Sequence, residues 1–425
     1  MIVRLIHARL LDPTETEERI GSLGIVDGRI EAAEHPALRK APTWDLDGRY
    51  VAPAFIDLHV HFREPGMEAA ETIVTGVAAA AAGGFQAVVT MPNTVPAMDR
   101  PELITAQCRR AREAGRVQVW PCGCLTVGRM GTELAPYEEL IRAGAVAFSD
   151  DGRTVADPRV MEAAMRKLAE LDRPVLDHAQ DPAAEHLGVL HDGAVARRLG
   201  LPGIPAEAEL RVVERDIDIV QRTGCRLHIQ HLSVGASVER VREAQRRGLP
   251  VTAEATPHHL ALCEEDLPGA DPNFKMNPPL RTRADRDALI AGVVDGTISC
   301  LATDHAPHTA ESKASGFEAA PFGVVGLETA IAVTWEVLVA TGRMSPLEWV
   351  RRWTVGPAAV LGRPAPSLRP GSPAHIVVVD SNANWTVDPE RFRSRSRNTP
   401  FAGRRFRAWP VAVCLNGVWV KGGPS

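Results

Sequence analysis

Lysine is scarce in this chain of 425 residues, and several features typical of particular protein classes are absent. Only five of the 48 basic residues are lysines, and the formal net charge of −5 argues against a nucleic-acid partner or a polybasic membrane contact. No run of 18 apolar residues occurs, so we expect no segment that spans a membrane. The first residues lack the basic and apolar regions of a signal peptide, which predicts a cytoplasmic protein.

The cysteines also give no sign of a disulfide framework. There are seven, an odd number, and none forms a Cys-X-X-Cys pair. Cys122 and Cys124 lie two residues apart in an apolar run, which favours buried reduced thiols over a redox or metal role.

Short β-rich runs alternate with helical stretches from about residue 54 to residue 361. This alternation is typical of a parallel sheet covered by helices. The predicted strands are residues 54–62, 87–93, 117–125, 145–151, 174–179, 225–232, 250–256 and 298–305. Eight strand–helix units in one block predict closure into a (β/α)8, TIM-like barrel.

The two ends of the chain differ from this central block. Residues 1–52 and 363–425 contain β runs, but neither piece is large enough to bury its own core. We therefore predict a small β-sandwich domain built from both termini around a catalytic domain of residues 53–362. A basic stretch at residues 391–407 is interpreted as a solvated loop.

Polar residues stand where the predicted barrel strands end. His59 and His61 are two residues apart and hence on one face of the first strand. A single barrel histidine is usually a hydrogen-bonded core residue, but two on one face of an apolar strand are hard to satisfy without a cation. The other strand ends carry Asp150 and Asp151 (fourth strand), His178 (fifth), His231 (sixth), and Asp304 and His305 (eighth).

These residues share the C-terminal face of the barrel, where barrel enzymes carry their chemistry. Nitrogen and oxygen donors without thiolate favour zinc, with manganese or iron as alternatives. Counting one residue from each of the adjacent pairs Asp150–Asp151 and Asp304–His305, four histidines and two aspartates are more than one tetrahedral site needs. We therefore predict two metal ions that share a bridging carboxylate and a bridging hydroxide.

The chain resembles dihydroorotases of the bacterial metal-dependent class. The resemblance covers about residues 50–330 and resumes at 398–403 (NTPFAG). It rests on residues 57–66 (DLHVHFREPG), 91–94 (MPNT), 148–152 (FSDDG), 275–280 (KMNPPL), 302–309 (ATDHAPHT) and 321–329 (PFGVVGLET). It implies one zinc ion at His59, His61 and Asp304, a second at His178 and His231, and a bridge by Asp151.

Many members of the wider amidohydrolase superfamily bridge their metals with a carbamylated lysine on the fourth strand. This sequence has none there, since its nearest lysines are Lys40 and Lys167. An aspartate bridge is what the chain can supply, and Asp151 is better placed for it than Asp150, which we interpret as structural.

The resemblance implies reversible cyclisation of N-carbamoyl-L-aspartate to L-dihydroorotate, a step of pyrimidine biosynthesis. Asp304 would act as general acid and base between the bridging hydroxide and the leaving nitrogen. Arg63 offers the fork that a substrate carboxylate fits, with Asn93 and His308 as further contacts. Asn277 and the backbone of Phe322 and Gly323 would contact the ring.

Other polar residues receive structural interpretations. We expect His305 to support its loop and His258 and His259 to support the site, while residues 309–320 form a mobile loop that closes over substrate. Gln180 departs from the family, which usually has an acidic residue there. The remaining histidines are interpreted as ordinary: His7, His35, His186, His191, His228 and His375.

Two other functions remain as alternatives. The first is hydrolysis of another cyclic amide, as in dihydropyrimidinases, hydantoinases and allantoinases. The absence of the bridging lysine and the presence of Arg63, Asn93 and His308 argue against it. The second is an inactive scaffold for aspartate carbamoyltransferase, but such relatives have lost metal ligands. We expect a homodimer acting on a small molecule, and leave association with aspartate carbamoyltransferase open.

Overall fold

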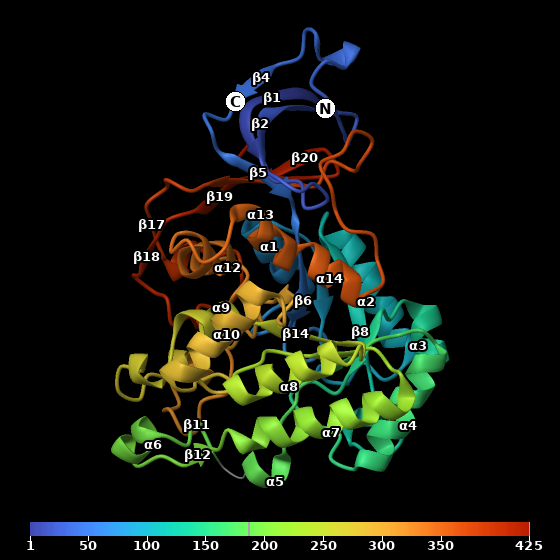
Figure 1. Cartoon of the computed structure of the whole chain (residues 1–425), viewed down its shortest axis with the longest axis vertical. Coiled ribbons are helices and arrows are strands. Elements are labelled where there is room, and N and C mark those ends of the chain that lie inside the picture. Colours follow the sequence, from blue (N-terminus) through green and yellow to red (C-terminus); the bar gives the residue numbers. More distant parts are fainter. Residues whose placement is uncertain (186–187, 425) are drawn as a thin grey trace.

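The computed structural model describes residues 1–185 and 188–424, and its centre is a barrel of eight parallel strands (Figure 1). A parallel bridge from Val60 to His305 links the first strand to the segment after the last. Every predicted strand is present and shorter than expected. The strands are β6 (Phe55–Val60), β7 (Phe85–Thr90), β8 (Gln118–Cys124), β9 (Ala147–Ser149), β10 (Val175–Asp177), β13 (Leu227–Ile229), β14 (Val251–Ala255) and β15 (Cys300–Leu301).

Helices follow the strands and cover the barrel (Figure 1). The first shows why they begin and end where they do: Thr72 and Thr75 cap each other's backbone at its start, and Gly84 ends it at a φ of 96°. The longer helices are α1 (Ile73–Gly83), α2 (Pro101–Ala114), α3 (Tyr137–Ala143), α4 (Pro158–Glu170), α7 (Glu207–Thr223), α8 (Gly235–Arg246), α10 (Arg283–Asp295) and α13 (Pro346–Trp353).

Shorter elements complete this part of the chain. The short helices are α5 (Pro182–Glu185), α6 (Ala194–Leu199), α9 (Pro257–Ala261), α11 (Ala310–Lys313), α12 (Ala330–Thr334) and α14 (Val355–Val360). Single 3-10 turns lie at Pro36–Leu38, Val127–Arg129, Glu264–Asp266, Pro272–Phe274 and Pro389–Arg391, and a π turn at Trp335–Val339. Two-stranded ribbons pair β11 (Leu190–His191) with β12 (Gly203–Ile204), and β17 (Trp385–Thr386) with β18 (Arg405–Phe406).

Both ends of the chain build a second sheet beyond one end of the barrel, as predicted (Figure 1). Its order is β20-β19-β16-β5-β1-β2-β3, with β4 also paired to β1. The sheet encloses a hydrophobic core of its own. Hydrogen bonds from the Ile30 amide to the Ser372 carbonyl, and from the Ala374 amide to the Gly28 carbonyl, join its N-terminal strands to the segment before β16. The strands are β1 (Ile2–Leu10), β2 (Arg19–Val26), β3 (Arg29–Ala32), β4 (Thr43–Asp45), β5 (Tyr50–Pro53), β16 (Ile376–Asp380), β19 (Trp409–Leu415) and β20 (Val418–Lys421).

Apolar side chains fill much of the barrel interior. One buried cluster draws residues from six of the eight strands, among them Ile56, Val89 and Leu176, and adds Ala358 and Val360 of α14. Because the interior is packed, we expect catalytic residues at the C-terminal ends of the strands. Within the described residues, no helix combines the length and the apolar character needed to cross a membrane.

Candidate metal and active site

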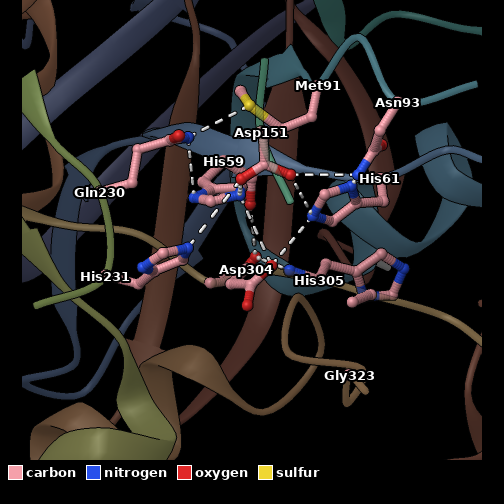
Figure 2. A network of polar contacts seen from close by, with 12 residues as sticks. His59, His61, Met91, Asn93, Asp151, Gln230, His231, Asp304, His305 and Gly323 are labelled. Atoms are coloured by element: carbon pink, nitrogen blue, oxygen red, sulfur yellow. Dashed lines mark hydrogen bonds and ion pairs between the residues drawn. The ribbon is translucent and has the colours of Figure 1, made fainter. Parts of the chain in front are cut away.

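Four candidate ligands meet at the end of the first barrel strand (Figure 2). His59 is 0% and His61 5% exposed, and the register of β6 against β7 shifts between Asp57 and Val60, just where the histidines stand. His59 Nε2 lies 3.2 Å from Asp151 Oδ1 and 3.5 Å from Asp304 Oδ1. His61 Nε2 lies 3.0 Å from Asp304 Oδ1 and 3.6 Å from Asp151 Oδ2.

The other two candidate ligands also lie near Asp151. His178 Nδ1 and His231 Nε2 are 2.9 Å apart, and they lie 3.8 and 3.9 Å from Asp151 Oδ1. Two groups of possible ligand atoms result, each within 4.8 Å of one another, and Asp151 belongs to both. The structure therefore brings together all six residues that the sequence nominated, with Asp151 at their centre.

The donor set suits cations. His59 Nε2 and Asp151 Oδ1 are buried and form no hydrogen bond, although they lie 3.2 Å apart, and an unsatisfied buried polar atom is costly. Burial opposes the charge of Asp151, but the imidazoles of His59, His61 and His178 hold the pKa of this carboxyl well below its usual value. The carboxylate is thus ionised at neutral pH. Imidazole nitrogens and carboxylate oxygens that converge in this way can hold metal ions.

The two cysteines of strand β8 are not among these candidate metal ligands. Cys122 and Cys124 are both buried, and burial raises the pKa of each thiol well above its ordinary value. They are free thiols, as expected.

The sequence did not predict the residues that orient His59. Its Nδ1 lies 2.8 Å from Glu254 Oε1 and 3.1 Å from Gln230 Nε2, and the second oxygen of Glu254 lies 3.0 Å from His228 Nε2. The amide of His231 donates to Glu254 as well, at 3.2 Å. A carboxylate behind a metal-binding histidine fixes its tautomer and orientation. The interpretation of His228 as unconnected to the site was therefore wrong.

A signal for Glu254 was present in the sequence. It is the one charged residue in the sequence VTAEA of β14, and an ionised residue within a buried strand needs buried partners.

The backbone is strained at three residues of the site. Arg63, His231 and Asp304 have φ values of 59°, 30° and 44°, in the left-handed region that non-glycine residues rarely adopt. Such conformations concentrate where the surrounding structure must aim a functional side chain.

Arg63 lies beside the metal ligands and is only 8% exposed. Its Nε donates to the Pro307 carbonyl at 3.1 Å, and its terminal nitrogen lies 3.3 Å from His308 Nε2. Among the described residues no carboxylate forms an ion pair with it, and burial lowers its pKa to about 10. A buried guanidinium without a counter-ion is prepared to bind an anion.

The comparisons with known proteins agree with this geometry. A model of the dihydro-orotase-like family matches residues 48–237. The dihydroorotase of Bacillus caldolyticus is 49% identical over 391 residues, 92% of each chain. That of Geobacillus kaustophilus is 50% identical over 380 residues, 89% of each chain. The chain belongs to the dihydroorotase family. It is a cyclic amidohydrolase.

Solved structures show the same fold as this member of the dihydroorotase family. The L-hydantoinase (dihydropyrimidinase) from Arthrobacter aurescens superposes with a TM-score of 0.87 at 22% identity, covering 100% of this chain and 96% of the other. The dihydropyrimidinase from Brevibacillus agri NCHU1002 has a TM-score of 0.83 at 20% identity, covering 99% and 95%. At these identities the likeness establishes the barrel and terminal sheet.

Two amides proposed for substrate binding from the dihydroorotase resemblance contact the candidate metal ligands. Asn93 Oδ1 accepts a hydrogen bond from His61 Nδ1 at 2.9 Å, and its Nδ2 donates to Asp151 Oδ2 at 3.1 Å. Asn277 Nδ2 lies 3.4 Å from His178 Nε2, while its Oδ1 is buried without a partner. Contact of either amide with substrate stays a prediction.

Several structural interpretations are confirmed. Asp150 accepts hydrogen bonds from the amides of Leu125 and Thr126, outside both ligand groups. His305 Nε2 lies 3.2 Å from Glu71, and its Nδ1 accepts from the Gly326 amide.

The remaining predicted polar residues differ in their surroundings. His259 lies between the Thr256 hydroxyl and the Pro278 carbonyl, whereas both amide atoms of Gln180 are buried without a partner. His186 lies outside the described residues.

Asn398 is a second residue whose role the dihydroorotase resemblance did not supply. Its Oδ1 accepts from the His308 amide at 3.1 Å, and its Nδ2 donates to the carbonyls of Ala306 and Gly323 at 3.1 and 3.0 Å. The first residue of the NTPFAG segment thus ties the predicted substrate-binding loops to one another.

Proposed function

We propose that this protein is a dihydroorotase that interconverts N-carbamoyl-L-aspartate and L-dihydroorotate with the help of two zinc ions. The observation that carries the proposal is the buried, unpaired Arg63 beside six convergent metal ligands. Relatives named dihydroorotase, 49 and 50% identical over about nine-tenths of the chain, support the same activity. A guanidinium beside a metal centre fits a substrate that is a cyclic amide and also carries a carboxylate, because the guanidinium can bind the carboxylate.

The six ligands divide between two ions in this proposal. His59, His61 and Asp304 hold one, His178 and His231 hold the other, and Asp151 lies between them. The two groups of possible ligand atoms, which share Asp151, support this division. Two zinc ions, when bound, supply hydroxide at neutral pH and polarise the amide carbonyl.

Asp304 carries the proton in the proposed reaction. It is 5% exposed, and the imidazoles of His59 and His61 lower its pKa against the opposing effect of burial. The carboxylate is therefore ionised at neutral pH and can accept a proton. Held by His61 at 3.0 Å, it takes the proton of the attacking water and passes it to the leaving amide nitrogen.

Arg63 supplies the positive charge that binds the substrate carboxylate. Burial and the neighbouring Arg63 lower the pKa of His308 to about 3, so its ring is neutral. His308 Nε2 lies 2.7 Å from the Phe322 carbonyl, which fixes the ring beside Arg63. We propose that His308 and Asn93 add neutral contacts to the carboxylate, and that Asn277 with the backbone of Phe322 and Gly323 contacts the ring.

The test compares dihydroorotate with dihydrouracil, the same ring without the carboxylate. Dihydrouracil would leave a buried guanidinium unpaired, a penalty of roughly 3–5 kcal/mol, or about 10²- to nearly 10⁴-fold in kcat/KM. Arg63→Met should remove most activity on dihydroorotate and narrow the gap between the two compounds. Hydrolysis of dihydrouracil within tenfold of dihydroorotate would instead favour a dihydropyrimidinase-like enzyme.

The proposal extends to the assembly and the domains. We infer a cytoplasmic homodimer with a catalytic domain of residues 53–362, and light scattering of the purified protein measures the assembly. A catalytically inactive scaffold is disfavoured because the full set of metal ligands is retained. Co-elution with purified aspartate carbamoyltransferase tests whether the active enzyme also binds that partner.

A further inference from the structure

Lys313, one of the five lysines of the chain, ends helix α11 and is 5% exposed. Its Nζ donates to the backbone carbonyls of Pro272, Lys275 and Pro321 at 2.8, 3.2 and 3.0 Å. An ammonium group has three N–H donors, so these three acceptors satisfy it completely.

The three carbonyls belong to segments that carry the proposed substrate contacts. Lys275 stands two residues before Asn277, and Pro321 stands directly before Phe322 and Gly323. The Lys275 carbonyl also accepts from the Gly323 amide at 2.9 Å. Helix α11 itself begins just after His308, with Thr309 as its cap. One ammonium group therefore joins the segments of Asn277, Phe322 and His308.

Within the described part of the chain, the charge of Lys313 is held by backbone carbonyls and not by a neighbouring carboxylate. Among the described residues no carboxylate forms an ion pair with Lys313, and an unpaired buried charge is unfavourable. Burial, together with the nearby ammonium of Lys275, lowers the pKa of Lys313 to about 7. A buried amino group that joins three segments proposed to bind substrate points to a role in the site.

We propose that Lys313 is a positioning residue that holds the Asn277, Phe322 and His308 segments in the arrangement that binds substrate. The inference rests on the proposed function, because those segments contact substrate only if that function holds. Lys313 is not among the candidate metal ligands. Its loss should therefore weaken substrate binding and leave the metal centre intact.

The test uses Lys313→Ala and added amines. Because misplacement by an ångström can cost orders of magnitude, we expect KM for dihydroorotate to rise by at least about tenfold, with kcat within about threefold and metal content unchanged. Propylammonium replaces the missing three carbons and ammonium, and should restore KM. It can reach the gap because Lys313 and His308 line one cavity of about 610 Å³.

Tetramethylammonium is the matched ligand control, since it carries the same charge without N–H donors and should not restore KM. Lys167→Ala, on a lysine exposed on the surface and paired with Glu138, is the control variant and should behave as wild type. Lys313→Arg keeps donors at this position and should give an intermediate KM. It also serves if the alanine variant does not fold.

A second measurement is independent of the substrate. Hydrogen exchange at the Gly323 amide, which donates to the Lys275 carbonyl, should be faster in Lys313→Ala than in wild type. Unchanged KM and unchanged exchange would overturn the proposal, as would a loss of metal at unchanged KM. A wild-type enzyme inactive on dihydroorotate would refute the proposed function instead, while the exchange experiment would still report on Lys313.

Discussion

Glu254 offers a test of how the first metal ligand is oriented. Its carboxylate is 0% exposed and lies 2.8 Å from His59 Nδ1 and 3.0 Å from His228 Nε2. Against the effect of burial, these two histidines lower its pKa to about 2, so it is ionised at neutral pH. Glu254→Gln preserves the shape of the side chain but removes the charge and one of the two acceptors.

The structure sets the size of the expected effect. For Glu254 to accept a hydrogen bond, His59 must carry a proton on Nδ1, and its Nε2 faces Asp151 and the candidate metal position. In Glu254→Gln, the side-chain NH2 group replaces one carboxylate oxygen. At least one of the hydrogen bonds that Glu254 now accepts is therefore lost. Loss of such a partner typically weakens metal binding about 10- to 100-fold, or about 1.4–2.7 kcal/mol.

The assay is equilibrium competition for zinc between the metal-free protein and a chelator of known affinity. Circular dichroism verifies that the variant is folded, and Glu138→Gln, an exposed partner of Lys167, is the matched control. A zinc affinity for Glu254→Gln within twofold of wild type would refute the reasoning that Glu254 holds His59 for the metal.

Three further predictions concern the reaction. Asp304→Asn keeps an oxygen donor but cannot move a proton, so kcat should fall by roughly 10²- to 10⁴-fold, and near wild-type turnover would exclude Asp304 from proton transfer. Elemental analysis should find two metals in wild type and one in His178→Ala or His231→Ala; a single metal in fully active wild type contradicts the two-ion site. Cyclisation consumes a proton, so the equilibrium should shift toward dihydroorotate about tenfold per pH unit lowered, and an unchanged product ratio would indicate a different reaction.

The convergence of the candidate metal ligands could be predicted from the sequence because the barrel geometry brings the strand ends together. In a parallel barrel all strands end on the same side, so polar residues at strand ends meet even when they are far apart in the chain. His59 and Asp304 are 245 positions apart, yet their side chains approach within 3.5 Å. Approximate positions for the strand ends were therefore sufficient to predict that these side chains meet.

Glu254 and His228 were harder because they lie within strands. Whether such a residue faces the site depends on the exact register, and a shift of one residue turns a side chain to the other face. The shift within β6 between Asp57 and Val60 shows that regular alternation does not hold there.

The loops and the terminal sheet were the least predictable parts. The order of the terminal sheet depends on pairs such as Tyr50 with Val379, which no local pattern specifies. The segment 309–320 was predicted as a mobile loop, and it contains α11 with the buried Lys313. Its closure over substrate stays a prediction.

Asn398 has a consequence for the order in which the enzyme becomes competent during synthesis. Asn398 accepts a hydrogen bond from the His308 amide, although it lies 90 residues further along the chain. The last candidate metal ligand in the sequence, Asp304, comes before both of them. At about 5–20 residues per second, the ribosome makes Asn398 roughly 5–20 s after His308. A nascent chain thus holds every metal ligand several seconds before the residue that fixes its substrate loops. In the proposed enzyme, the residues of the metal centre are therefore synthesised before those that complete the substrate pocket.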